Sequence, residues 1–145
     1  MKSVIQRVTD ASVSVDGVCV GEIEHGLLVY LGVEKGDSVE QLSWLCSKIT
    51  KLRVFADEKG KMNLSLKDVG GSLLVISQFT LCADLHKGNR PSYNEAADPK
   101  DAEPLYEKAL EIFDTLGFPV EKGIFGAHMS VTYTNDGPVT MALDA

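Results

Sequence analysis

The amino-acid sequence predicts a single α+β domain, residues 1–145, in which antiparallel strands curve into a barrel-like core and two main helices pack outside it. Three observations predict this class. Seven or eight short segments alternate, or run apolar, as strands do. Two longer segments have the apolar period of helices, and most neighbouring strands are joined by hairpin-type turns. A chain of 145 residues buries roughly two thirds of its unfolded surface, enough for one core.

The N-terminal third predicts three strands. Residues 2–15 alternate between apolar and polar side chains, and Asp16-Gly17 is a strong hairpin signal that leads into a second strand at 18–23. Residues 27–33 follow Gly26 and are apolar at successive positions. A continuous apolar run of this length is typical of a central strand buried on both faces.

The first helix is predicted from about residue 38. Asp37 or Ser38 can cap its start, with Glu40 or Gln41 three residues further on as the return partner. One side carries an apolar stripe, beside which Trp44 is expected to pack: Val39, Leu42, Leu45, Cys46, Ile49 and Leu52.

The second helix ends at Gly117. Its start is left open between caps at Asp98 and Asp101, because Pro104 has no N–H to donate inside a helix. Its apolar side consists of Ala102, Leu105, Tyr106, Ala109, Phe113 and Leu116.

The remaining segments are shorter. Residues 52–55 predict a short strand before a turn at 57–60, and residues 62–66 fit either a strand or a helical turn. The polar connection 82–98 has no period, and connections of this length are usually functional or mobile. Further strands are predicted at 120–122, 128–134 and 139–143. The last of these leaves an open sheet edge that a homodimer would cover.

Charge and hydropathy limit the classes of function. The 14 Lys and Arg against 21 Asp and Glu give a net charge of −7, which argues against a broad nucleic-acid footprint but permits contact with the end of a strand. Lys48, Lys51 and Arg53, or Lys87 and Arg90, are candidates for a local basic patch. The sequence contains neither an apolar run of about 20 residues nor a signal-peptide core, so we expect a cytoplasmic protein that does not enter membranes.

Cysteine and histidine are used sparingly. Cys19, Cys46 and Cys82 are odd in number and widely spaced, so a disulfide framework is not expected. The first two fit apolar patterns and are predicted to lie in the core, whereas Cys82 follows a polar cluster but has no neighbouring histidine to activate it. No metal or cofactor site is predicted, because the three histidines stand at no recognised ligand spacing: His25, His86 and His128.

The clearest candidate site follows the apolar run 73–76. There Ser77, Gln78 and Thr80 replace apolar residues, with Phe79 between them. Buried polar groups without partners cost roughly 1–3 kcal/mol each, so these side chains either cap the strand or bind something. The Thr80 hydroxyl would need a base to act as nucleophile, and none is nearby in sequence. Alternatively, the Phe79 and Thr80 amides form an oxyanion hole, worth roughly 10²–10³ in rate per donor.

A second unusual stretch runs from Asn135 to Thr140. Asp136-Gly137 is a hairpin signal, but Pro138 follows directly and cannot donate to a strand ladder. From the residues alone an ordinary trans turn is favoured, because only about 5–6% of X–Pro bonds in folded proteins are cis. A cis bond would instead direct the Gly137 and Pro138 carbonyls the same way, as a pair of acceptors.

Together these two stretches resemble a known pair of sequence motifs. Ser77-Gln-Phe-Thr-Leu81 and Asn135-Asp-Gly-Pro-Val-Thr140 are similar to the two signature motifs of the D-aminoacyl-tRNA deacylases. Further segments fit the same family's pattern, so the resemblance runs from end to end of the chain: residues 4–8, 26–29, 61–64 and 90–92.

The resemblance implies a homodimer that hydrolyses the ester between a D-amino acid and the 3′-terminal ribose of tRNA without metal or cofactor. It implies that glycine mischarged on tRNA(Ala) is also accepted. Gly137-Pro138 would then be cis and inserted into the partner's pocket, where its carbonyls hold the substrate amine and an L side chain collides with them.

The resemblance also assigns roles to the first motif. Ser77, Gln78, Phe79 and Thr80 would form an anchoring wall, assisted by the ribose 2′-OH, with Thr80 not a covalent nucleophile. Arg7 would either brace the Gly-Pro loop or form a plain surface salt bridge. The alternative to the enzyme is a non-catalytic nucleic-acid-binding homodimer.

Overall fold

The sheet is organised around its first strand. In a computed structural model, which describes residues 1–145 throughout, β1 (Lys2–Val15) pairs with three other strands. Along one edge lie β2 (Val18–Ile23) and then β3 (Gly26–Gly32), with Ile23 opposite Ala11 and Gly26 opposite Val8. Along the other edge lies β8 (Ser130–Asp144), antiparallel to β1 over nearly its whole length.

The other half of the sheet is parallel. β6 (Ser72–Ser77) pairs with β3, and β7 (Val120–Lys122) pairs with β6, both in the parallel sense. The sequence-based expectation of a wholly antiparallel sheet is therefore wrong here. The reason is the long crossover through α1 (Val39–Thr50) and a small ribbon of β4 (Phe55–Ala56) and β5 (Met62–Leu64), which returns the chain to its starting end before β6.

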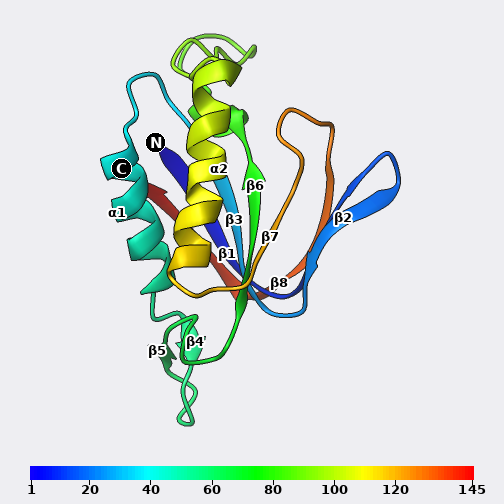
Figure 1. The fold of residues 1–145 in the computed structure, drawn as a ribbon, viewed down its shortest axis with the longest axis vertical. Helices are drawn as coiled ribbons and strands as arrows, with labels where there is room; N and C mark the ends of the chain where they lie inside the picture. The colour runs from blue at the N-terminus through cyan, green and yellow to red at the C-terminus, as the bar shows by residue number, and fades with distance from the viewer.

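The expected α+β, barrel-like architecture with two outer helices is confirmed (Figure 1). α1 begins at Ser38, whose hydroxyl accepts from the Gln41 N–H while the Gln41 side chain accepts from the Ser38 N–H. α2 (Pro99–Thr115) begins after Asp98, with Pro99 in the first turn and Pro104 inside the helix. Of the two starts left open by the sequence, the structure therefore has the earlier one.

Two apolar clusters lie on opposite faces of β3 and β6. One packs beneath the two helices and includes the fully buried Tyr106 and Phe113 of α2. The other fills the space between β6 and the folded-over part of β1 and β2, and consists of Val8, Ala11, Val13, Ile23, Leu28, Leu74 and Ile76. Burial on both faces explains why β3 and β6 are apolar at successive positions.

Two predicted core residues are exposed instead. Trp44 is 50% exposed because it lies between the inward positions Leu42 and Leu45 and so points away from the sheet. Cys19 is exposed on β2, whereas Cys46 is buried as expected. No helix is long and apolar enough to cross a membrane.

β8 differs most from its prediction. The sequence predicts two strands, 128–134 and 139–143, joined by a turn, but residues 130–144 form one strand that pairs with β1 on both sides of the Gly-Pro stretch. Thr140 lies opposite Gln6 and Asn135 opposite Val8, so four residues, 136–139, stand opposite Arg7 alone. The stretch is therefore a bulge within a strand, and the outer edge of β8 has no partner strand in the chain.

Candidate active site

The first wall of the site stands where β6 ends. After Ser77, the Gln78 N–H donates to the Leu31 carbonyl at 2.8 Å, and the chain turns into a short 3-10 helix, η1 (Phe79–Cys82). The first N–H groups of a helix have no partner inside it, which leaves the Phe79 and Thr80 amides as donors at the end of the strand. The Gln78 side-chain amide donates to the Thr80 hydroxyl.

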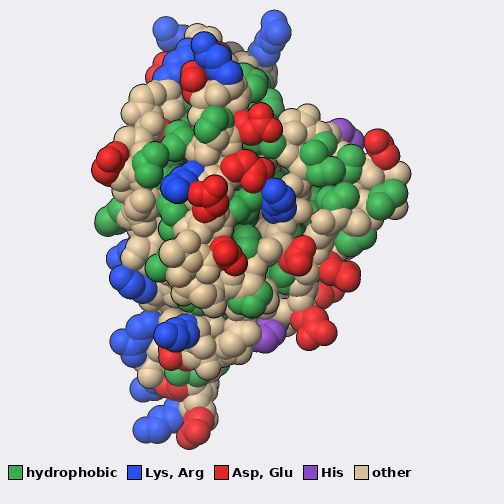
Figure 2. All heavy atoms as spheres, in the orientation of Figure 1, with side chains coloured by type: hydrophobic (Ala, Val, Ile, Leu, Met, Phe, Trp, Pro, Cys, Tyr) green, Lys and Arg blue, Asp and Glu red, His purple; other side chains and the backbone are tan.

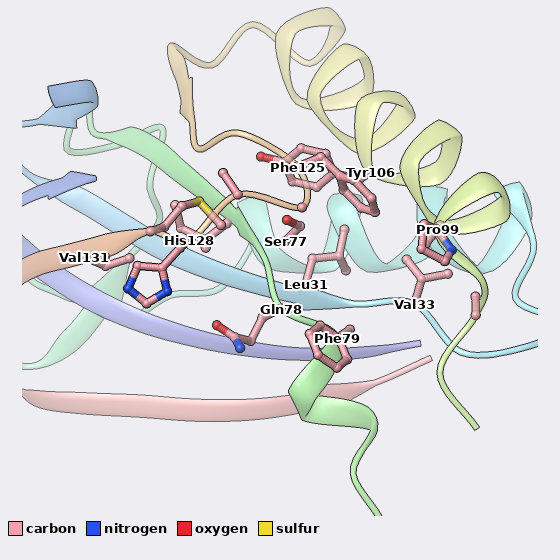
Figure 3. A pocket seen from close by; sticks show the side chains of 16 residues that line it. Leu31, Val33, Ser77, Gln78, Phe79, Pro99, Tyr106, Phe125, His128 and Val131 are labelled. Carbon is pink, nitrogen blue, oxygen red and sulfur yellow. The ribbon is translucent and has the colours of Figure 1, made fainter. Parts of the chain in front are cut away.

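A cavity of about 540 Å³ opens beside this wall (Figure 3). Ser77, Gln78 and Phe79 form one side, Pro99 and Tyr106 of α2 form another, and Phe125 and His128 of the loop before β8 approach from the third. Eleven of its 16 lining residues are hydrophobic. Such a volume and lining suit a small, largely apolar group, with the polar groups of the wall fixing its orientation.

The structure adds residues that the sequence did not indicate as functional. Tyr106 was read only as part of a helical core stripe, and its hydroxyl donates to the Val75 carbonyl at 2.9 Å. Burial raises the pKa of this phenol, so Tyr106 remains neutral in the pocket wall. Phe125 and His128 carried no signal, because they come from a loop without a motif. Phe79 is 58% exposed and packs edge-on against Tyr93, with ring centroids 5.0 Å apart.

Thr80 lies beside the cavity but is not among its lining residues, and it is exposed on η1. Cys82, two residues further on, is buried with its Sγ 3.6 Å from the Val33 carbonyl. Burial, and then the charge of Glu34, raise the pKa of the Cys82 thiol, which makes it a poor nucleophile. The groups at the mouth of the pocket are therefore hydroxyls, amides and backbone N–H donors, suited to positioning and polarising a substrate.

The Gly137–Pro138 peptide bond is cis, in agreement with the family resemblance and not with the trans turn favoured by the residues alone. Asn135 connects the two ends of the bulge through its side chain. Its side chain donates to the Thr140 hydroxyl at 2.8 Å and accepts from the Val139 N–H at 3.2 Å.

Arg7, on the neighbouring strand β1, contacts the bulge. Its Nε lies 2.9 Å from a carboxylate oxygen of Asp136 and 3.3 Å from the Asp136 carbonyl, and its Nη1 donates to the Val54 carbonyl. The Arg7 side chain is only 14% exposed. Arg7 therefore links the bulge to Val54 as a partly buried side chain, and its predicted role as a brace remains a prediction.

The two candidate regions are apart within one chain. Arg7 is opposite Leu27, which pairs with Leu73 at the start of β6, whereas Ser77 at the end of β6 pairs with Leu31. Four residues of strand correspond to about 13 Å, and three strand spacings also separate β8 from β6. The structure thus brings Ser77, Gln78, Phe79 and Thr80 together, and separately Arg7, Gly137 and Pro138.

No cluster of His, Cys, Asp or Glu side chains is arranged to hold a metal ion. The three histidines lie in separate segments, and His86 contacts only Asp84, at 2.6 Å.

Comparison with solved structures defines the class. The c-Myc DNA Unwinding Element Binding Protein matches with a TM-score of 0.95 and 41% identity, covering 100% of this chain and 99% of that one. A probable eukaryotic D-amino acid tRNA deacylase matches with a TM-score of 0.81 over 99% and 98% of the two chains, and at 16% identity this likeness shows the fold alone. The fold therefore places the chain in a class of α+β domains with a barrel-like mixed sheet and two outer helices.

The family follows from the sequence matches. A family model described as D-Tyr-tRNA(Tyr) deacylase covers residues 4–144. Relatives named D-aminoacyl-tRNA deacylase include those of Thermomicrobium roseum, 54% identical over 100% of this chain and 94% of the relative, and Fervidobacterium nodosum, 55% identical over 100% and 97%. The chain belongs to the D-Tyr-tRNA(Tyr) deacylase family.

Proposed function

We propose that the protein hydrolyses the ester bond of D-aminoacyl-tRNA, releasing the free D-amino acid and tRNA, and that it also removes glycine mischarged on tRNA(Ala). Family membership and the names of the relatives support this. The observation that carries it is the apolar, aromatic-lined cavity directly beside a wall of hydrogen-bond donors. The 3′ end of an aminoacyl-tRNA has two groups that match these features: a terminal base for the apolar cavity and an aminoacyl ester for the donors. The proposed place of action is the cytoplasm.

The proposed chemistry is activation by position. The ester carbonyl oxygen accepts from the Phe79 and Thr80 N–H groups, which stabilise the charge that develops there as water attacks. The oxygen of water bonds to the carbonyl carbon and the bond from that carbon to the ribose oxygen breaks. The proton lost by the attacking water passes to the leaving ribose oxygen with help from the neighbouring 2′-OH. Thr80 forms no covalent intermediate, because its hydroxyl contacts Gln78 and no base.

The proposed selectivity comes from a second subunit. The Gly137–Pro138 loop of one protomer reaches the partner's Thr80, where its two carbonyls accept from the substrate α-amino group. An L side chain then collides with the loop, whereas a D side chain points away and glycine has none. Support comes from the brace at Arg7, from the distance between loop and wall within one chain, and from the open edge of β8.

The direct test compares two esters. Purified protein should release tyrosine from D-tyrosyl-tRNA and leave L-tyrosyl-tRNA intact under the same conditions. Persistence of both esters, or equal cleavage of both, would contradict the proposal. Rapid quenching followed by mass spectrometry should find no acyl group on Thr80, and an adduct there would replace the proposed chemistry by covalent catalysis.

One observation favours a second candidate, a nucleic-acid-binding homodimer without catalysis. The 41% identical structure bears the name of a DNA unwinding element binding protein. This candidate predicts binding of DNA or tRNA that strengthens steeply at low salt and is indifferent to the aminoacyl group. The net charge of −7 counts against it.

A further inference from the structure

The positive charge of this acidic chain is concentrated in one segment. Residues 48–68, named here the basic lobe, carry six of the 14 Lys and Arg side chains but only three of the 21 acidic ones, so the lobe is +3 and the rest of the chain is −10. The lobe comprises the last residues of α1 and the β4–β5 ribbon. Figure 2 shows its blue side chains gathered at the lower end of the molecule, with further blue at the upper end and red between.

The cations of the lobe are available to a partner. All six are exposed, and none forms an ion pair within the chain: Lys48, Lys51, Arg53, Lys59, Lys61 and Lys67. Two of the three acidic residues, Asp57 and Asp68, accept hydrogen bonds within turns. Asp57 accepts from the Lys59 and Lys61 N–H groups at 2.9 and 3.0 Å, and Asp68 accepts from the Ser65 N–H at 2.8 Å. The lobe thus presents positive charge to an anionic ligand.

The lobe is attached to the Gly-Pro bulge. Arg7 donates to the Val54 carbonyl in the lobe and at the same time pairs with Asp136 in the bulge. The two features therefore form one unit at the end of the sheet where β6 begins. The pocket lies at the other end, where β6 finishes, and Figure 1 shows the β4–β5 ribbon and the start of α2 at opposite ends of the molecule. A lobe so placed is remote from the pocket of its own chain.

We propose that the basic lobe binds phosphates of the tRNA acceptor arm, and that it does so for the pocket of the partner subunit. The proposal rests on the proposed function. In a two-fold dimer, a bulge that reaches the partner's wall carries the attached lobe to the mouth of the same pocket. The tRNA strand that leaves this pocket carries one phosphate per nucleotide. Because the partner's lobe lies at the mouth of the pocket, these phosphates pass its cations.

This placement also explains how a protein with a net negative charge can bind tRNA, which is itself a polyanion. A small footprint beside one pocket needs only a few phosphate contacts, each contributing about 0.7–0.9 to the slope of log affinity against log salt. The acidic remainder of the surface repels the rest of the tRNA, so that binding is confined to the acceptor end.

The test compares two pairs of neutralised lysines. The lobe variant is Lys59→Gln with Lys61→Gln, and the control is Lys108→Gln with Lys122→Gln, which removes the same charge from α2 and β7. On D-tyrosyl-tRNA the lobe variant should lose about tenfold in kcat/KM, and its salt slope should fall by about 2. On D-tyrosyl-adenosine, which has no phosphates, it should match the wild type. An equal loss on both substrates, an equal loss in the control, or an unchanged slope would overturn the proposal.

Filter binding of uncharged tRNA separates this proposal from the proposed function. A wild type that binds tRNA through the lobe yet cleaves no D-ester would refute the activity while supporting the lobe. A wild type that cleaves the ester, with tRNA binding equal in the lobe variant, would refute the lobe alone.

Heterodimers test the action across subunits. One subunit carries the lobe variant and an intact pocket, and the other carries Thr80→Pro and an intact lobe. If the lobe serves the partner's pocket, the working pocket keeps its lobe and the heterodimer should have about half the wild-type activity on D-tyrosyl-tRNA. About one twentieth of the wild-type activity, which is half that of the lobe homodimer, or a failure of the two chains to associate, would overturn the assignment across subunits.

Discussion

The wall at the end of β6 and the bulge in β8 are held in place by different means. The wall continues a strand whose residues 73–76 are at most 1% exposed, and a main-chain bond from Gln78 to Leu31 fixes its position. The bulge is held by side chains, those of Arg7 and Asn135. Main-chain anchoring places the proposed chemistry and side-chain anchoring places the proposed selectivity, so the two should fail separately when mutated.

The largest effect is expected from removing a main-chain donor of the wall. Thr80→Pro deletes the N–H of Thr80 in the first turn of η1 and should lower kcat on D-tyrosyl-tRNA by about 10²–10³-fold. Thr80→Ala keeps the N–H and should retain most activity. Single-turnover rates of the two variants measure the difference. Equal, large losses in both would show that the hydroxyl carries the chemistry.

A smaller but still large effect is expected in the bulge. Gly137 has φ +124°, and a Cβ there would lie 2.9 Å from Val139 Cγ2 and 3.0 Å from Arg7 Nη2. Gly137→Ala must displace Val139, Arg7 or the loop itself, and a displacement of about 1 Å at a positioning group costs about 10²-fold in rate. Gly117→Ala is the matched control, with φ +86° but no atom within 4 Å. If Gly137→Ala hydrolyses D-tyrosyl-tRNA at the wild-type rate, the bulge has no part in the mechanism.

Weakening the brace should have an intermediate effect on selectivity. Arg7→Lys keeps the charge but cannot contact both Asp136 and Val54, because an ammonium lacks the guanidinium fork. We expect the D-to-L ratio of hydrolysis rates to fall about tenfold, with about 1–3 kcal/mol lost in stability from the unpaired Val54 carbonyl. The ratio and the urea midpoint are measured on the same preparation. An unchanged ratio with reduced stability would confine Arg7 to a structural role.

The smallest effect is expected at the N-terminal amine, which lies at the end of the sheet where the wall stands. The Met1 amine lies 2.8 Å from Asp37 and 3.1 Å from Glu34. Burial lowers its pKa, but the hydrogen bonds and charges of these carboxylates outweigh burial, and the net pKa is raised. The stabilisation is therefore complete below about pH 8, the unfolded pKa, and is lost as pH rises through the folded value. Urea unfolding from pH 7 to 10 should show this loss, and Asp37→Asn should reduce it.

Sequence periodicity predicted most of the elements, because apolar residues on both faces of β3 and β6 and on one side of each helix reflect burial directly. It also located the wall, where an apolar run turns abruptly to Ser77 and Gln78. The parallel pairing of β6 could not be predicted, because a strand's pattern records which faces are buried and not the direction of its neighbour. Asp136-Gly137 was misread as a hairpin turn, since a local signal contains nothing about β1 continuing alongside. The pocket residues Phe125 and His128 reach the wall only through the tertiary fold.

The register around Arg7 has a consequence for how the loop is attached to the sheet. Because Gln6 faces Thr140 and Val8 faces Asn135, deleting residues 136–138 would leave Val139 opposite Arg7 and every other pair unchanged. The proposed handedness filter thus corresponds to a three-residue insertion in the ladder between β1 and β8, next to a second register shift between Val8 and Asp10. The pairs on either side of the loop would be the same without it, so the loop adds a substrate-facing element to the sheet at no cost to the core.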